Sequence, residues 1–381
     1  MARFRKIKKI VFLTGTRADF GKIKSLIKAS NRESKFKAYV FATGMHLNPK
    51  YGRTVDEIYN SKIVNVHEFT NHSLNNGMDQ ILAKTISGFS FYVKKINPDL
   101  IILHGDRPET LAGAIVGSFN NILVAHIEGG EVSGTIDELI RHSVSKLAHV
   151  HLVSNKKAKQ RLIQLGEKKS SIYILGSPDI DLLKSNKLPS LINTKKHYDI
   201  PFNSYSTVLY HPVTTEQSHT KKHISNLIKS LIKSKKNYIV IYPNNDYGSE
   251  IIISEYRKLK SIKNFKVFPS LRFEYFLTVL KNSNFIIGNS SSGIIEAPYY
   301  NIPTINIGTR QNNRLNYDRI FNCSNHHLDI LKKINAVSKI KKSKSKPKFF
   351  GEGNSSKYFI KILKSRKIWN IKLQKYFQDV N

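Results

Sequence analysis

Short apolar runs alternate along the chain with longer segments in which apolar residues recur every three or four positions. The first runs, KIVFL at 9–13 and FKAYVFA at 36–42, have the length and composition of buried strands. The segment between them places Ile23, Leu26 and Ile27 on one face of a helix. This alternation predicts parallel strand–helix–strand units, in which helices cover the faces of a sheet.

The alternation runs to about residue 176 and then starts again near residue 207. In the first half we expect further strands at 100–103, 122–127, 150–153 and 171–175, with helices at 20–29, 54–60, 78–96, 108–119, 136–147 and 156–165. In the second half we expect strands at 207–210, 238–242, 265–268, 285–288 and 303–307, with helices at 218–234, 248–259, 272–281, 293–299 and 355–377. The pattern therefore predicts an α/β protein with two doubly wound domains.

Residues 183–206 separate the two halves. The segment is polar and rich in lysine, and it contains Pro189 and Pro201. We therefore predict an N-terminal domain over 1–182, a linker over 183–206 and a C-terminal domain over 207–364. Two such domains in series should face a cleft at the carboxyl ends of their strands, where open α/β sheets bind ligands.

Composition places the chain among ordinary globular proteins but gives it an unusual charge. Its 381 residues are 40% hydrophobic and 23% charged, which argues against wholesale disorder. A single cysteine, Cys323, rules out an internal disulfide and fits a reducing compartment. No apolar run approaches the roughly 20 residues needed to span a bilayer. We expect a cytoplasmic protein that does not bind a membrane.

The formal net charge of +35 raises the possibility of a nucleic-acid partner. Lysine carries most of the excess, whereas nucleic-acid recognition relies more on arginine and interleaved aromatic residues. We therefore interpret the charge as a solvated lysine-rich surface and expect no nucleic-acid partner. Residues 96–140 differ from the rest, because they hold seven carboxylates and one basic residue, Arg107.

Four of these carboxylates follow predicted strands of the first domain. Asp106 comes after the strand at 100–103, and Glu128 and Glu131 come after the strand at 122–127, each beside glycines that allow close approach of a ligand. Asp137 begins the next helix. Parallel strands end at the same edge of a sheet, so these groups should converge, and clustered carboxylates suit proton transfer. We predict that they are catalytic. They have no recognised metal-binding spacing.

The second domain and the first glycine turn offer groups for an anion. Arg17 lies in the turn GTRADFG at 15–21, which opens a helix, and His211 ends the strand at 207–210. The segment GNSSSG at 288–293 runs from a strand into a helix, and its amides and hydroxyls suit a phosphate. Glu296 could bind a ribose and Arg310 adds a cationic donor. We predict nucleoside-diphosphate binding by Arg17, Ser290, Ser291, Ser292, Gly293, Glu296 and Arg310.

These motifs together resemble the hydrolysing UDP-N-acetylglucosamine 2-epimerases, which supply N-acetylmannosamine-type sugars for sialic and legionaminic acid synthesis. The similarity runs in order over about residues 7–365. It rests on GTRADFG at 15–21, TGMHL at 43–47, GDR at 105–107, HIEGGE at 126–131, DELIRH at 137–142, GNSSSGIIEAP at 288–298, NIGTRQ at 306–311 and FGEG at 350–353.

The resemblance implies a fold of the glycosyltransferase-B type, in which a last helix, about 365–381 here, packs back on the first domain. It also implies elimination of UDP as a carboxylate takes the C2 proton, then hydration of the 2-acetamidoglucal with C2 protonated on the opposite face. It makes Asp106, Glu128 and Asp137 catalytic carboxylates and His211 a catalytic histidine near the diphosphate, with Glu131 a weaker candidate. Which carboxylate is base and which is acid stays open. We place His46, Arg107 and Arg141 at the sugar, expect no cofactor or metal, and expect a homo-oligomer, either a dimer or a tetramer.

Several alternatives remain. The same chemistry could act on UDP-2,4-diacetamido-2,4,6-trideoxyglucose, which differs at C4 and C6. A non-hydrolysing epimerase, which returns UDP-N-acetylmannosamine, fits the Gly-Gly-Glu131 segment less well. A glycosyltransferase would share the fold but needs an acceptor site that the sequence does not reveal. A nucleic-acid-binding protein would rest on the charge alone.

Overall fold

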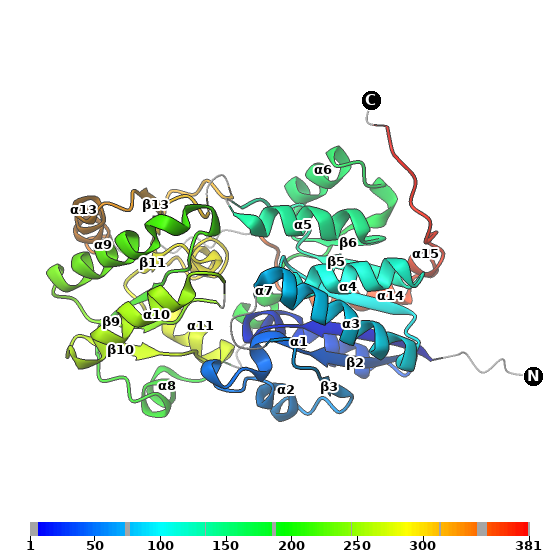
Figure 1. Cartoon of the computed structure of the whole chain (residues 1–381), viewed down its shortest axis with the longest axis horizontal. Coiled ribbons are helices and arrows are strands. Elements are labelled where there is room, and N and C mark those ends of the chain that lie inside the picture. The colour runs from blue at the N-terminus through cyan, green and yellow to red at the C-terminus, as the bar shows by residue number, and fades with distance from the viewer. Residues whose placement is uncertain are drawn as a thin grey trace, which may run out of the picture. The chain divides into compact units, whose positions relative to one another are not determined.

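The computed structural model describes residues 7–72, 77–133, 135–184, 188–244, 246–311, 314–340 and 349–379. The chain forms two compact units, the first from residues 1–131, 137–184 and 349–381, and the second from residues 132–136 and 185–348 (Figure 1). Residues 185–187 of the predicted linker and 380–381 of the predicted last helix lie outside the described residues.

The first unit is built on a seven-stranded sheet with the strand order β3-β2-β1-β4-β5-β6-β7. All of its strand pairings are parallel. The strands are β1 Lys8–Thr14, β2 Phe36–Ala42, β3 Val66–Glu68, β4 Leu100–His104, β5 Leu123–Ile127, β6 Val150–Val153 and β7 Ile172–Ile174. The helices are α1 Arg17–Asn31, α2 Asp56–Asn60, α3 Met78–Ile96, α4 Pro108–Phe119, α5 Ile136–Leu147, α6 Lys156–Gln164, α7 Pro178–Lys184, α14 Ser355–Lys364 and α15 Arg366–Trp369, with 3-10 turns at Gly44–Leu47, Pro49–Tyr51 and Lys169–Ser171.

Successive side chains of a strand point to opposite faces of the sheet, so alternate residues of the central strands pack against different layers of helices. Phe12 of β1 belongs to the core that also holds the apolar side of α1 and Phe359 of α14. Leu103 of β4 contacts the other layer, where α4 carries glycine at 113 and 117. A Cβ atom at Gly113 would lie 2.5 Å from a methyl carbon of Leu103, so glycine lets α4 approach the sheet closely.

The second unit repeats this plan with a six-stranded parallel sheet in the order β10-β9-β8-β11-β12-β13. Its strands are β8 Ser206–Leu209, β9 Tyr238–Ile241, β10 Phe265–Phe268, β11 Ile286–Gly288, β12 Thr304–Ile307 and β13 Ile320–Cys323. Its helices are α8 Leu191–His197, α9 Thr220–Lys233, α10 Ser249–Lys258, α11 Phe273–Lys281, α12 Glu296–Tyr299 and α13 His327–Val337, with 3-10 turns at Thr214–His219, Leu259–Ser261 and Ser291–Gly293.

The strand order reverses between β1 and β4 in the first sheet and between β8 and β11 in the second. In open α/β sheets, ligands bind outside the carboxyl ends of the strands at such a reversal. The predicted fold class, two doubly wound parallel α/β domains, is confirmed. The loops after β1, β4, β8 and β11 carry Arg17, Asp106, His211 and the serine-rich turn, and other motifs singled out above follow β2, β5 and β12.

Three predicted elements differ from the structure. The helix expected at 355–377 is two shorter helices, because the chain becomes extended at Ser365 and its side chain caps α15. The helix expected at 293–299 is the 3-10 turn Ser291–Gly293 followed by the four-residue α12. The segment expected as a linker at 183–206 contains a helix, α8, whose first turn is capped by Ser190.

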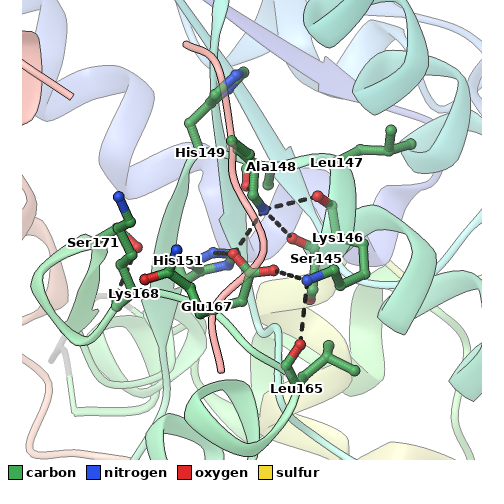
Figure 2. A network of polar contacts seen from close by, with 12 residues as sticks. Ser145, Lys146, Leu147, Ala148, His149, His151, Leu165, Glu167, Lys168 and Ser171 are labelled. Atoms are coloured by element: carbon green, nitrogen blue, oxygen red, sulfur yellow. Dashed lines mark hydrogen bonds and ion pairs between the residues drawn. The ribbon is translucent and has the colours of Figure 1, made fainter. Parts of the chain in front are cut away.

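After α15 the chain lies along the end of α5 (Figures 1 and 2). The ammonium of Lys375 donates to the carbonyls of Lys146 and Ala148, both at 2.7 Å, and lies 2.6 Å from Oε2 of Glu167. Glu167 is also 2.9 Å from both Lys146 Nζ and His151 Nε2. Burial works to raise the pKa of Glu167, but its contacts with His151 and Lys375 lower it to about 2. Lys375 thus satisfies carbonyls at the end of α5, and Ser118 Oγ donates to the remaining one, that of Leu147, at 2.8 Å.

Replacing Lys375 with Met should lower the thermal midpoint by about 2–6 °C, because α5 loses its C-terminal cation and Glu167 loses one of three partners. Differential scanning fluorimetry measures this. Lys372→Met is the matched control: Lys372 is exposed in the same segment, and a surface change there should stay within roughly 0.5 kcal/mol. Equal effects of the two variants would contradict an anchoring role for Lys375.

Candidate functional site

The predicted carboxylates of the first unit lie where β4 and β5 end and α5 begins. Asp106 follows β4 and contacts the guanidinium of Arg141, which α5 presents from a position that is 2% exposed. Arg141 also donates from Nη1 to the carbonyl of Glu131 at 3.3 Å. Burial works to lower the pKa of Arg141, but Asp106, Asp137 and Glu131 raise it above its ordinary value. The structure therefore groups Asp106, Asp137 and Glu131 around one buried cation.

Glu128 has an unusual backbone conformation. Its φ is +66°, in the left-handed region that glycine adopts easily and that costs a residue with a Cβ atom of order 1–3 kcal/mol. Glycines follow directly at 129 and 130, yet the left-handed position that ends β5 carries a glutamate. Strain of this kind persists where the surrounding structure fixes it, and it is concentrated at functional sites. The backbone thus singles out Glu128 in the loop after β5.

Side chains from three other elements hold the Glu128 carboxylate. Ser177, in the loop after β7, donates from Oγ to Glu128 Oε1 at 2.9 Å. Lys22 of α1 places Nζ 3.4 Å from the same oxygen and 3.7 Å from Asp179 Oδ2. His104, the last residue of β4, places Nε2 3.5 Å from Oε1. Two cationic side chains therefore face one oxygen of Glu128.

The remaining predicted residues of the first unit have partners within it. His46 is fully buried, and its ring nitrogens lie 3.0 Å from Thr14 Oγ1 and 2.8 Å from Thr54 Oγ1. Burial lowers its pKa to about 4, so the ring is neutral at pH 7. These contacts favour a role in holding the loop after β2. Arg17 pairs with Glu57 at 2.9 Å.

Arg107 and Glu131 are both buried near the carboxylate group. Arg107 precedes the first turn of α4 and is 8% exposed. Burial works to raise the pKa of Asp19, but the contact of that carboxyl with His104 and the charge of Arg107 lower it below its ordinary value. Glu131 Oε1 accepts a hydrogen bond from Asn155 Nδ2 at 3.3 Å. Glu131 is thus tied to the helix α6 cap and supports the loop after β5.

In the second unit, a reciprocal pair of hydrogen bonds joins the ends of β8 and β11. The His211 amide donates to Asn289 Oδ1 at 2.6 Å, and Asn289 Nδ2 donates to the His211 carbonyl at 2.8 Å. His211 Nδ1 accepts from the amide of Asn244 at 3.1 Å, which places the proton of the neutral ring on Nε2. Arg310 Nη1 and Gln311 Nε2 donate to the Asn289 carbonyl at 3.3 and 3.0 Å. Asn289 is the centre of this arrangement.

The serine-rich segment after β11 forms a tight turn. Gly288 is required at its start, because a Cβ atom there would lie 2.0 Å from the carbonyl oxygen of Leu209. Ser290 Oγ accepts from the Ser292 amide at 3.3 Å, and Ser291–Gly293 is a single 3-10 turn. Glu296 begins the short α12 and is 2% exposed. The helix expected at 293–299 is replaced by this turn and the four-residue α12, so any anion would rely on local amides, hydroxyls and Arg310.

Four residues that contact Glu128 directly or through Lys22 were not predicted from the sequence: Lys22, His104, Ser177 and Asp179. His104 and Ser177 lie at strand ends, so the rule that identified Asp106 and Glu128 also applied to them. Lys22 is 7% exposed and lies between the buried residues Gly21 and Ile23 of α1. A lysine among buried positions of a helix was the feature of the sequence that could have identified it.

Comparison with known proteins decides the family. The family model described as UDP-N-acetylglucosamine 2-epimerase matches residues 28–364. The chain belongs to this family. It is 42% identical over 377 residues to the UDP-N-acetylglucosamine 2-epimerase of Neisseria meningitidis serogroup B, covering 98% of this chain and 100% of the relative. It is 33% identical to the UDP-N,N'-diacetylbacillosamine 2-epimerase (hydrolyzing) of Legionella pneumophila, covering 94% of this chain and 96% of the relative.

Solved structures of this epimerase family share the fold. A Methanocaldococcus jannaschii UDP-GlcNAc 2-epimerase in complex with UDP-GlcNAc and UDP matches with a TM-score of 0.79 at 20% identity, covering 93% of this chain and 99% of the other. The Neisseria meningitidis UDP-GlcNAc 2-epimerase bound to UDP-GlcNAc matches with a TM-score of 0.78 at 19% identity, with the same coverage.

Within the residues that the structure describes, no group of three or more His, Cys, Asp or Glu side chains is arranged to hold a metal ion. The helices among those residues include none that is both long enough and apolar enough to cross a membrane.

Proposed function

We propose that this epimerase-family member is a hydrolysing enzyme that converts UDP-N-acetylglucosamine to N-acetylmannosamine and UDP, for the synthesis of sialic-type acids. The observation that carries the proposal is the strained Glu128 among the carboxylates at the ends of β4 and β5. The 42% identical relative bears the name of a UDP-N-acetylglucosamine 2-epimerase.

The reaction needs two proton transfers at C2 of the sugar. In the first step a carboxylate of the group Asp106, Glu128 and Asp137 takes the C2 proton, the C1–O bond breaks, and UDP leaves with the electron pair. In the second step water adds to C1 of the 2-acetamidoglucal, and C2 receives a proton on the opposite face. General acid–base groups in such steps contribute about 10²–10⁴-fold to the rate. Arg141 would hold Asp106 in place.

The second unit would bind the nucleotide. The turn Ser290–Gly293 offers hydroxyls and amides, and His211, with its proton on Nε2, can donate to a diphosphate oxygen. Arg310 adds a cation, and the Glu296 carboxylate can accept both ribose hydroxyls. Arg17 of the first unit would contribute a further cation. This assignment keeps nucleotide recognition and proton transfer on different loops.

A second substrate also has support. The Legionella pneumophila relative and a Campylobacter jejuni relative at 32% identity are named as hydrolyzing 2-epimerases of N,N'-diacetylbacillosamine nucleotides. The same elimination and hydration would act on that sugar, which differs from N-acetylglucosamine at C4 and C6. Incubation with each UDP-sugar, followed by identification of the products, separates the two.

Isotope labelling tests the reaction. In D₂O the free product sugar should carry one deuterium at C2, because the original C2–H bond breaks and the new proton comes from a side chain in exchange with solvent. In H₂¹⁸O the label should enter the C1 hydroxyl, and UDP should stay unlabelled, because the C–O bond is cleaved. Proton NMR and mass spectrometry of both products measure this.

The alternatives give different labelling. A glycosyltransferase that hydrolyses its donor labels C1 but keeps the original hydrogen and configuration at C2. A non-hydrolysing epimerase exchanges the C2 hydrogen but returns a UDP-sugar. Retention of the C2 hydrogen from the substrate would overturn the proposed mechanism for either UDP-sugar.

A further inference from the structure

The imidazole of His104 lies buried between two carboxylates. It is 5% exposed, with Nδ1 3.6 Å from Asp19 Oδ1 and Nε2 3.5 Å from Glu128 Oε1. Asp19 comes from the first turn of α1, and Glu128 follows β5. The charged side chains that face this arrangement are Lys22, near Glu128, and Arg107, whose charge acts on Asp19. His104 is therefore the link between two carboxylates on different elements.

The ring is charged but not locked in place. Burial works to lower the pKa of His104, yet Glu128 and Asp19 raise it to about 9, so the ring carries both protons at pH 7. At 3.5 and 3.6 Å its nitrogens are just beyond the distance of a strong hydrogen bond. Neither ring nitrogen has a hydrogen-bond partner of normal geometry among the described residues. A small movement would bring Nε2 within bonding distance of Glu128.

Hydration of the glycal requires a group that holds a proton when the step begins. Asp106 contacts Arg141, and Glu128 faces Lys22, so both carboxylates lie beside cations that favour their ionised forms. A carboxylate in its ionised form has no proton to give. The buried imidazolium beside Glu128 has one.

We propose that His104 is the positioning residue that supplies the proton of the second step, by passing it from Nε2 to Glu128, which delivers it to C2 of the glycal. This rests on the proposed function. In the step, the Nε2–H bond breaks as the Glu128 O–H bond forms, and the new C2–H bond then takes that proton while water oxygen bonds to C1. The water loses one proton to a neighbouring carboxylate or to solvent, and solvent recharges His104. No oxidant, reductant or metal is needed.

The acid and the base among the carboxylates can then be distinguished. Glu128, which receives its proton from His104, is the acid of the hydration step. The base that takes the original C2 proton is one of the aspartates, Asp106 or Asp137. Because different groups act on the two faces of C2, the proton that is added to C2 is not the one that was removed from it.

His104→Gln tests this by separating the two steps. With the UDP-sugar that wild type converts, NMR quantifies released UDP, free 2-acetamidoglucal and free sugar. We expect the ratio of glycal to sugar to rise about tenfold or more, because elimination proceeds and hydration lacks its proton source. Hydration of supplied 2-acetamidoglucal in the presence of UDP should fall by a similar factor.

His126→Gln is the matched control. His126 is likewise buried, with Nε2 2.8 Å from the carbonyl oxygen of Gly105 in the loop after β4 and Nδ1 3.0 Å from Ser145 Oγ of α5. Loss of this structural contact should lower both steps together and leave the ratio unchanged. If His104→Gln likewise lowers UDP release and sugar formation in parallel, with no glycal released, the proposed relay is wrong.

A measurement on the wild-type protein does not depend on how a variant folds. With ring-¹⁵N-labelled histidine, one imidazole signal should titrate near pH 9. No histidine signal that titrates above about pH 8 would overturn the proposal. Failure of the relay, seen in His104→Gln or in the histidine titration, can be distinguished from failure of the proposed function. In the latter case the wild-type protein itself forms no 2-epimerised free sugar.

Discussion

Asp106→Asn, Glu128→Gln and Asp137→Asn should each lower turnover by roughly 10²-fold or more. Each change keeps the shape of the side chain and removes the group that carries a proton. UDP affinity should change little, because the residues assigned to the nucleotide lie mainly in the second unit. Steady-state assays of free sugar formation and calorimetry with UDP measure the two quantities separately.

Glu138→Gln is the matched control for these variants. Glu138 neighbours Asp137 on α5, is partly exposed and lies 3.3 Å from Nε2 of His142, outside the group around Arg141. Its turnover should stay within a few-fold of wild type. If two of the three carboxylate variants keep more than about a tenth of wild-type turnover, the assigned proton-transfer groups are wrong.

The regular parts of the fold were predictable because their signals are local. The strand at 36–42 and the helix at 78–96 have the bounds expected from the hydrophobic pattern. Some of the missed elements are short or depend on tertiary contacts, although the eleven-residue helix α13 was missed as well. β3 spans only Val66–Glu68, and it is defined by its pairing with β2. The last helix ends early because Ser365 caps a new turn, and Lys375 then anchors an extended segment to α5.

The candidate site was predictable where one rule sufficed. The carboxyl ends of parallel strands meet at one edge of a sheet, which is enough to select Asp106 and Glu128. The positions of the strand ends do not indicate which side chains pair with these two carboxylates. Lys22 reaches Glu128 from α1, and Ser177 reaches it from the loop after β7, over sequence separations of 106 and 49 residues. Such partners become visible only when the packing of the layers is known.

The charge states of the histidines likewise depend on spatial neighbours that the sequence does not reveal. His46, His104 and His126 all lie near strand ends of one sheet, and the sequence does not reveal which of them is charged. Burial lowers the pKa of His46 to about 4 and that of His126 to about 3, where few carboxylates compensate. At His104 two carboxylates outweigh burial. The chemistry of each imidazole is thus set by its neighbours in space.

Glu296 is the residue that we assign to the ribose hydroxyls of UDP, so its loss should reduce UDP affinity. Glu296→Ala should weaken UDP binding by roughly 1–3 kcal/mol, about 5–150-fold in Kd, the scale for losing a charge-assisted hydrogen bond to a ribose. Isothermal titration calorimetry measures it. Because α12 has only four residues, its dipole adds little, and the carboxylate itself must supply the interaction.

Glu255→Ala provides the comparison, since Glu255 lies on α10 of the same unit and pairs with Lys258 at 2.6 Å. That variant should bind UDP as wild type does. The affinity should fall in Glu296→Ala while the glycal-to-sugar ratio stays at its wild-type value, because Glu296 acts on the nucleotide and not on C2. An unchanged Kd would place the ribose elsewhere, whereas a changed ratio with an unchanged Kd would give Glu296 a part in proton transfer.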